Sequence, residues 1–167
     1  MKHMTILYLH GLNGCLSPEK RIVLEQYGDV FSPAIEYEKD SDVIHGISAS
    51  FNLHDIDVVI GSSMGGFTGY YVSNHYQCPA LLFNPPLSNR SVYQEIPEIE
   101  YKKSSLKHIV LGTLDEVVNP VETFQFLGNT VASNPEYTIH LRNDLAHRIP
   151  IEIFEEEVEH FFSKMRD

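Results

Sequence analysis

A serine between two glycines is the strongest chemical signal in this sequence. Residues 61–65, GSSMG, have the form G-x-S-x-G, which can make a sharp turn that exposes a nucleophilic serine. Centring the motif on Ser62 would need a glycine in place of Ile60, so Ser63 is the predicted nucleophile. The alternative is a glycine-rich turn that only joins two elements, and the motif by itself leaves that alternative open.

A nucleophilic serine needs a histidine that accepts its proton and an acid that orients the histidine. With this type of turn the acid follows the serine in the chain and the histidine comes last. Asp115 and His147 each lie in a loop after an apolar run, in that order. We therefore expect His147 to take the proton of Ser63 and Asp115 to fix the tautomer of His147. Glu116 is an alternative acid, and Asp115 could instead only cap the helix that follows.

The sequence holds nine histidines, so the choice of His147 depends on where the others lie. Most of the others lie in or near predicted strands and helices, where a histidine is more often structural or solvated. These are His45, His54, His75, His108, His140 and His160. His147 follows the last predicted strand in a loop, which favours it as the base.

Two backbone N–H groups would have to stabilise the charge that develops on the substrate oxygen. The N–H of Met64 follows the nucleophile at the positive end of a helix, and that of Leu12 lies in the loop after the first strand. We predict these groups as the oxyanion hole, although the loop of Leu12 could also be an ordinary strand-ending turn. Nearby side chains are the candidates for the substrate pocket: His10, Asn13, Pro85 and Tyr93.

Apolar runs that predict strands alternate with amphipathic stretches that predict helices. The strands are expected at residues 5–9, 30–35, 56–60, 79–83, 108–111 and 137–141. The helices are expected at residues 17–27, 40–53, 64–76, 120–128 and 151–164. Gly28 is expected to stop the first helix, and Pro33 to place its strand at a sheet edge. The alternation predicts an α/β fold with three αβα layers around a parallel sheet of about six strands.

Residues 85–106 interrupt this alternation with prolines and little apolar periodicity. We expect a single domain over residues 1–167, in which residues 85–106 form a short lid-like insertion over the site. Its cations could steer an anionic substrate or could simply be solvated: Arg90, Lys102 and Lys103. Its larger apolar side chains could form a wall against an acyl chain: Tyr93, Ile96, Ile99 and Tyr101.

Composition and charge indicate which binding partners and which cellular location to expect. Acidic side chains number 23 against 12 Lys and Arg, a formal net charge of −11 that disfavours nucleic acid as a partner. Cys15 and Cys78 lack metal-ligand spacing, so we predict buried, reduced thiols, no metal and no cofactor. The apolar segment at residues 5–9 is too short for a signal peptide, and no run approaches the roughly 20 residues of a membrane span. We expect a cytoplasmic protein that acts on a small molecule and does not bind membranes; a homo-oligomer is compatible with the sequence.

These segments together resemble the α/β-hydrolase superfamily, and more closely its small YqiA-like esterase branch. The resemblance spans nearly the whole chain and rests on runs that start at Tyr8, Gly61 and Asp115, on Asn84-Pro85, and on the His147 loop. The chain departs from the pattern in a shorter excursion after Asn84 and in the residues that flank His147.

The resemblance implies a minimal α/β-hydrolase that lacks the first strands of the superfamily. It would cleave a carboxylic ester or thioester of a small acyl substrate through an acyl-serine intermediate, with Ser63, Asp115 and His147 at the triad positions. A peptidase or amidase could use the same triad. A non-catalytic module that binds a small ligand or a protein is a further alternative, but such a module has no need of an intact triad.

Overall fold

The computed structural model describes residues 3–98, 105–132 and 136–165. The strands are β1 Met4–Leu9, β2 Gly28–Phe31, β3 Val58–Ser62, β4 Ala80–Phe83, β5 Lys107–Gly112 and β6 Tyr137–Arg142. The helices are α1 Pro18–Glu25, α2 Val43–Ser48, α3 Met64–Tyr76, α4 Pro120–Thr130 and α5 Ile151–Lys164. Strands and helices therefore alternate as the sequence predicts.

The strands form one parallel six-stranded sheet in the order β2-β1-β3-β4-β5-β6. The chain runs outward from β1 to β2 and then returns to place β3 on the other side of β1. Ligands of open parallel sheets bind where the strand order reverses in this way, outside the carboxyl ends of the strands. Leu9 at the end of β1 pairs with Gly61 near the end of β3, so the serine motif lies at that point.

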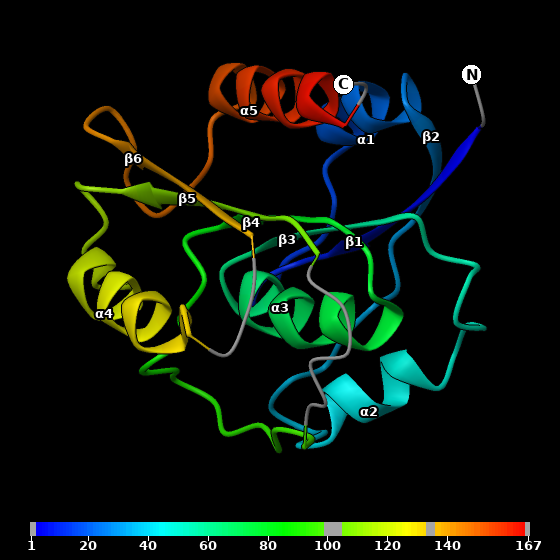
Figure 1. Cartoon of the computed structure of the whole chain (residues 1–167), viewed down its shortest axis with the longest axis horizontal. Helices are drawn as coiled ribbons and strands as arrows, with labels where there is room; N and C mark the ends of the chain where they lie inside the picture. The colour runs from blue at the N-terminus through cyan, green and yellow to red at the C-terminus, as the bar shows by residue number, and fades with distance from the viewer. Residues whose placement is uncertain (1–2, 99–104, 133–135, 166–167) are drawn as a thin grey trace.

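Helices cover both faces of the sheet, as Figure 1 shows: α1 and α5 lie on one face, and α2, α3 and α4 on the other. Alternate residues of a strand point to opposite faces, so each face has its own core. Ile6 and Tyr8 of β1 pack toward α1 and α5. Leu7 and Leu9 pack toward α2 and α3. The predicted three-layer αβα architecture is confirmed.

The start of the chain differs from the predicted boundaries. Helix α1 ends at Glu25, and Gly28 is the first residue of β2 rather than the stop of the helix. A Cβ on Gly28 would lie 2.0 Å from the carbonyl oxygen of Met4, so this glycine lets β2 approach β1. Strand β2 is an edge strand as predicted, but it ends at Phe31, before Pro33.

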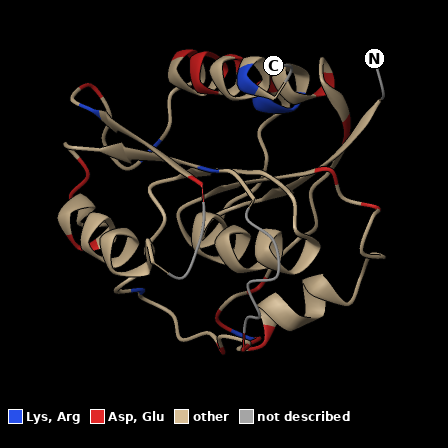
Figure 2. Cartoon of the chain, viewed as in Figure 1, with Lys and Arg blue, Asp and Glu red and all other residues tan. Residues whose placement is uncertain are grey.

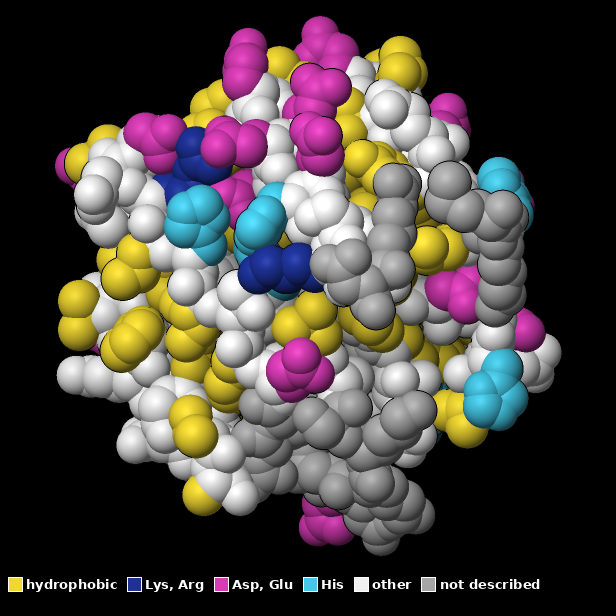
Figure 3. Space-filling model, turned by 45° about the horizontal axis from the view of Figure 1, so that its top comes forward, with side chains coloured by type: hydrophobic (Ala, Val, Ile, Leu, Met, Phe, Trp, Pro, Cys, Tyr) yellow, Lys and Arg dark blue, Asp and Glu magenta, His cyan; other side chains and the backbone are white. Residues whose placement is uncertain are grey.

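Charge is unevenly spread over the surface. Asp and Glu residues recur along α5 in Figure 2, and Asp and Glu side chains gather in the upper part of the face in Figure 3, where few Lys and Arg side chains appear. Among the described residues, none of the helices is both long enough and apolar enough to cross a membrane.

Candidate active site

Ser63 lies between the end of β3 and the start of α3, in a backbone conformation that side chains rarely adopt. Its φ of 55° and ψ of −123° are in a region that favours glycine. A Cβ on Gly61 would lie 2.1 Å from the carbonyl oxygen of Gly65, and a Cβ on Gly65 would lie 1.9 Å from that of Leu9. Both glycines of the motif are therefore needed for the chain to turn this sharply beside β1.

The loop after β1 lies directly against Ser63. A Cβ built on Gly11 would be 3.3 Å from the Cβ of Ser63, so the backbone of this loop passes close to the predicted nucleophile. The loop turns tightly, because the N–H of Gly14 donates to the carbonyl of Gly11 at 3.1 Å and Asn13 adopts a φ of 53°. Two segments far apart in the sequence thus meet at the carboxyl edge of the sheet.

Asp115 and His147 are joined at the same edge. The Nδ1 of His147 lies 2.9 Å from Oδ2 of Asp115, whose side chain is 1% exposed. The other oxygen of Asp115 accepts N–H groups from Val117 and Val118 at 2.8 and 2.9 Å. A carboxylate held in this way accepts a hydrogen bond from the N–H of Nδ1. The other ring nitrogen of His147, Nε2, is then unprotonated and can accept a proton. The alternative acid, Glu116, is exposed.

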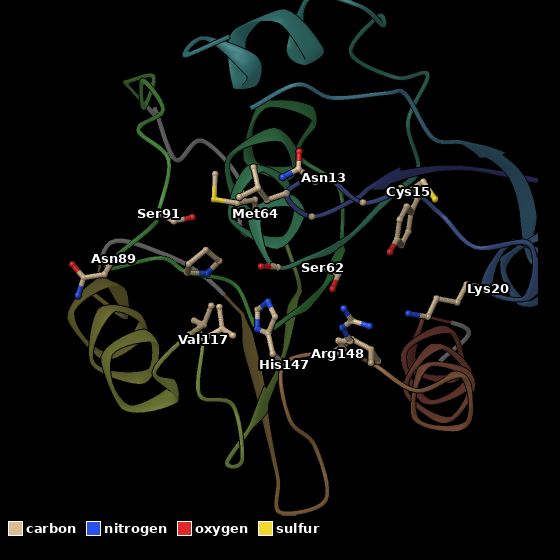
Figure 4. Close-up of a pocket in the computed structure, with 18 residues that line it drawn as sticks. Asn13, Cys15, Lys20, Ser62, Met64, Asn89, Ser91, Val117, His147 and Arg148 are labelled. Carbon is tan, nitrogen blue, oxygen red and sulfur yellow. The ribbon is translucent and has the colours of Figure 1, made fainter. Parts of the chain in front are cut away.

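Ser63 and His147 line one cavity of about 600 Å³, whose walls come from the ends of β1 and β3, from α1, and from the loops after β4, β5 and β6. Figure 4 shows the ring of His147 at the centre of this cavity, beside Ser62 and between Val117 and Arg148. Within the described residues, no hydrogen bond joins Ser63 to His147. In unliganded enzymes such hydrogen bonds are often long and tighten when substrate binds.

The predicted oxyanion groups lie on the wall of this cavity. Met64 is the first residue of α3, so its N–H has no acceptor inside the helix and carries part of the positive end of the helix dipole. Leu12 follows Gly11 in the loop that contacts Ser63. Leu12 and Met64 both line the cavity, as do Ser62 and Ser63.

The four side chains predicted for the substrate pocket lie in different places. Asn13 lines the cavity. His10 is instead structural: its Nδ1 lies 2.6 Å from the carbonyl oxygen of Gly11, and its Nε2 accepts the N–H of Ile35 at 2.9 Å. Pro85 packs under Gly66, and the adjacent Pro86 lines the cavity in its place. Tyr93 is 70% exposed and lies outside the cavity lining.

The predicted lid-like insertion lies at one side of the cavity. Residues 85–98 contain no helix or strand, and Asn89 and Ser91 line the cavity with Pro86. The buried amide of Gln94 donates to the carbonyl oxygens of Tyr37 and Asp40 at 3.0 and 2.8 Å, which ties this segment to the loop before α2.

The side chains of the insertion were predicted to steer an anion or to contact an acyl chain, and the structure describes only some of them. The guanidinium of Arg90 lies 4.5 Å from the ring centre of Phe67, so Arg90 packs on α3. Ile96 is 45% exposed. The remaining residues named for the lid lie outside the described residues: Ile99, Tyr101, Lys102 and Lys103.

The two cysteines also differ from the prediction that both are buried. Cys78 is buried, and burial raises the pKa of its thiol to about 12. Cys15 is exposed because it lies in the loop after β1, where it lines the cavity. Both thiols are free.

A second cluster of ionisable groups joins α5 to the sheet. Ligand atoms of His108, His140 and Glu157 lie within 4.8 Å of one another, an arrangement that could hold a metal ion. However, Arg142 donates to Oε1 of Glu157 at 2.8 Å, and His140 contacts the same oxygen at 2.6 Å. Because a guanidinium already satisfies this oxygen, the cluster is best described as a buried ion-pair network.

Sequence reasoning missed Asn84 as a site residue. It lies at the end of β4 with a φ of 44° and is 2% exposed. Its amide nitrogen donates to the carbonyls of Ala146 and His147, and its amide oxygen accepts the N–H of Gly112. The signal that could have found it is a polar residue directly after the apolar run of a central strand. Lys20 and Arg148, which line the cavity, were also missed.

The comparisons with known proteins agree with the fold. A family model described as an uncharacterised protein family, UPF0227, matches residues 5–164. No curated protein sequence matches the chain.

Several solved structures superpose on nearly the whole chain. SOBER1 from Arabidopsis thaliana has a TM-score of 0.71 at 13% identity, over 99% of this chain and 100% of that chain. A carboxylesterase from Bacillus cereus has a TM-score of 0.67 at 16% identity, over 96% and 88%. Est1E from Butyrivibrio proteoclasticus has a TM-score of 0.65 at 13% identity, over 99% and 89%. These likenesses show that the chain has the α/β-hydrolase fold.

Proposed function

The chain belongs to the UPF0227 family and has the α/β-hydrolase fold, and from this premise we propose that it is a serine hydrolase of small carboxylic esters or thioesters. One observation carries the proposal. Ser63 in its strained turn and His147, whose Nδ1 contacts Asp115, line one cavity at the carboxyl edge of the sheet. The name of the superposed carboxylesterase supports the same class of reaction.

In the proposed mechanism the Oγ of Ser63 attacks the carbonyl carbon of the substrate while Nε2 of His147 accepts the hydroxyl proton. Asp115 holds His147 in the tautomer that leaves Nε2 unprotonated, and it stabilises the imidazolium that forms. The N–H groups of Leu12 and Met64 donate to the oxygen on which negative charge develops.

The tetrahedral intermediate then collapses. The bond to the alcohol or thiol breaks, and His147 returns the proton to that leaving group. A water molecule enters, gives a proton to His147 and attacks the acyl-Ser63 ester. Breakdown of the second tetrahedral intermediate releases the carboxylic acid and restores the serine hydroxyl.

Covalent labelling with a fluorophosphonate and hydrolysis of 4-nitrophenyl butyrate test the proposal. We expect the label on Ser63 and a fall in kcat on the order of 10⁶-fold in Ser63→Ala, as in other triads. Ser62→Ala is the matched control, because Ser62 is the adjacent serine in the same cavity. Wild-type protein that neither takes the label nor hydrolyses acyl esters would refute the proposal and favour a binding module.

A peptidase or amidase would use the same residues. Substrates with one acyl group and either an anilide, a thioester or an ester leaving group separate these activities. We expect the ester and thioester to be cleaved and the anilide to be cleaved far more slowly, because the amine is a poorer leaving group.

A further inference from the structure

We propose that the cavity beside Ser63 selects substrates that carry an anionic group, a carboxylate or a phosphate, and that Lys20 and Arg148 bind this group. The inference rests on the proposed hydrolase function and adds a substrate class to it.

Lys20 and Arg148 reach the cavity from opposite ends of the sequence. Lys20 lies in the first turn of α1, and Arg148 follows the predicted base in the loop after β6. Figure 4 shows their cationic ends pointing toward each other at one side of the cavity, across from Asn89 and Ser91 of the insertion. The cavity therefore has a cationic side and a neutral side.

The cationic side has no acidic counterpart. Although the chain has 23 acidic residues and only 12 Lys and Arg, no Asp or Glu of the described residues lines this cavity. Lys39 and Arg142, by contrast, each have a carboxylate partner: Lys39 lies 2.7 Å from Glu36, and Arg142 lies 2.8 Å from Glu157. No carboxylate of the described residues forms an ion pair with Lys20 or Arg148. A substrate anion would supply the missing charge.

The surroundings of Lys20 and Tyr8 favour the binding of an anion. The ammonium of Lys20 lies 5.2 Å from the ring centre of Phe154, and its partial burial lowers the pKa of the amine. A partly desolvated ammonium gains more from an anionic partner than a fully hydrated one. Tyr8 lines the same cavity, and burial raises the pKa of its hydroxyl to about 12, so that a protonated hydroxyl is available at neutral pH as a hydrogen-bond donor.

Paired substrates that differ in one anionic group test the inference. The first pair is 4-nitrophenyl hydrogen adipate and its methyl ester, which place or remove a carboxylate on the acyl side. The second pair is 3-carboxyphenyl butyrate and its methyl ester, which do the same on the leaving-group side. A third pair, phenyl butyrate with and without a ring phosphate, distinguishes phosphate from carboxylate.

The quantity measured is the ratio of kcat/KM for the charged ester to that for its neutral partner. We expect a ratio of about tenfold in at least one pair, since two partly exposed charge contacts contribute about threefold each. Lys20→Met and Arg148→Gln should each lower the ratio about threefold, and Arg148→Glu, which also adds a repulsive charge, should bring it to about one. Lys39→Gln removes one positive charge outside this cavity and should leave the ratio as in the wild type.

The outcomes separate the two proposals. Ratios at or below one in all pairs overturn the inference, and so do ratios that the Lys20 and Arg148 variants do not change. In either case, hydrolysis of the neutral esters still upholds the hydrolase function. If the wild type hydrolyses none of the esters and Ser63 takes no fluorophosphonate, the hydrolase function fails and the substrate class fails with it. Arg148 is exposed, so its variants test the inference even if Lys20→Met does not fold.

Discussion

The side-chain amide of Asn84 holds the main chain of His147. Its nitrogen donates to the carbonyl oxygen of His147 at 3.2 Å and to that of Ala146 at 2.9 Å, and its oxygen accepts the N–H of Gly112 at 2.8 Å. Gly112 ends β5, three residues before Asp115. One buried amide thus fixes the loop of the proposed base relative to the strand that leads to the proposed acid.

Asn84→Asp should therefore impair catalysis by moving the base. A carboxylate cannot donate to the two carbonyl oxygens and would repel them, so we expect kcat to fall about 10²-fold with a smaller change in KM. Unfolding free energy should fall by about 1–3 kcal/mol, since buried groups lose their partners.

Steady-state kinetics and the rate of fluorophosphonate labelling check this positioning function. Asn143→Asp is the control, because Asn143 is exposed in the same loop and its oxygen only accepts from Thr113. An Asn84→Asp variant that is destabilised but labels as fast as the wild type would show a purely structural function.

The acid of the site can be separated from its neighbour. In Asp115→Asn, the oxygen can still accept from Val117 and Val118, which turns the NH₂ group toward Nδ1 of His147 and favours the wrong tautomer. We expect kcat to fall about 10⁴-fold. Glu116→Gln should keep most of the activity, because Glu116 is exposed. The opposite result in the same ester assay would reassign the acid.

The backbone conformation of Ser63 predicts that a glycine at this position stabilises the fold and abolishes activity. A non-glycine residue at a φ of 55° and ψ of −123° costs about 1–3 kcal/mol. Ser63→Gly should therefore raise the free energy of unfolding by about 1 kcal/mol and abolish ester hydrolysis, whereas Ser63→Ala abolishes hydrolysis without that gain. Urea denaturation measures the difference. Ser62→Gly, in the extended backbone of β3, should be destabilising; if both glycine variants lower stability alike, the turn stores no strain.

The need for glycine at position 65 of the serine motif can be tested by comparison with Gly46, where a side chain has space. A Cβ on Gly65 would lie 1.9 Å from the carbonyl oxygen of Leu9, whereas nothing lies within 4 Å of a Cβ on Gly46 in α2. Gly65→Ala should destabilise the protein by several times the roughly 1 kcal/mol that Gly46→Ala adds through better helix propensity. Denaturation midpoints compare them, and wild-type stability in Gly65→Ala would show that the turn can relax.

The network below α5 should make the protein sensitive to acid. Burial raises the pKa of Glu157, but hydrogen bonds from His108 and Arg142 outweigh this effect and lower the pKa to about 2. The folded-state pKa is below the ordinary value of 4.5, so the network stabilises the fold fully above that pH. This contribution should be lost as the pH falls from about 4.5 toward 2.

Glu157→Gln tests the network, because it removes the buried carboxylate that pairs with Arg142. Arg142 keeps its ion pairs with the exposed carboxylates of Asp144 and Glu156. We expect a loss of about 1–3 kcal/mol at pH 7 and a shallower decline in stability between pH 5 and pH 3. Urea denaturation across this pH range gives both values. The exposed Glu155→Gln on the same helix is the control, and an unchanged acid limb in Glu157→Gln would assign the sensitivity to other carboxylates.

The sequence alone predicted most elements of the fold and indicated the proposed nucleophile. Helices α3 and α5 have the predicted bounds. Apolar periodicity defines α5 locally, whereas α3 is buried on nearly all sides and begins directly after the glycine-containing turn. The turn at Ser63 was equally readable, because the glycines that it needs are adjacent in the chain.

Only the tertiary structure decided which side chains meet. It set Asp115 rather than Glu116 against His147, gave His10 two hydrogen bonds to loop backbone, and placed the amide of Asn84 against the carbonyl of His147. The same is true of the cationic side of the cavity, where Lys20 and Arg148 converge from segments more than a hundred residues apart. Such contacts depend on how strands pair and loops pack at the edge of the sheet. Residue types and spacing determine where a loop occurs, and packing determines which of its side chains face the nucleophile.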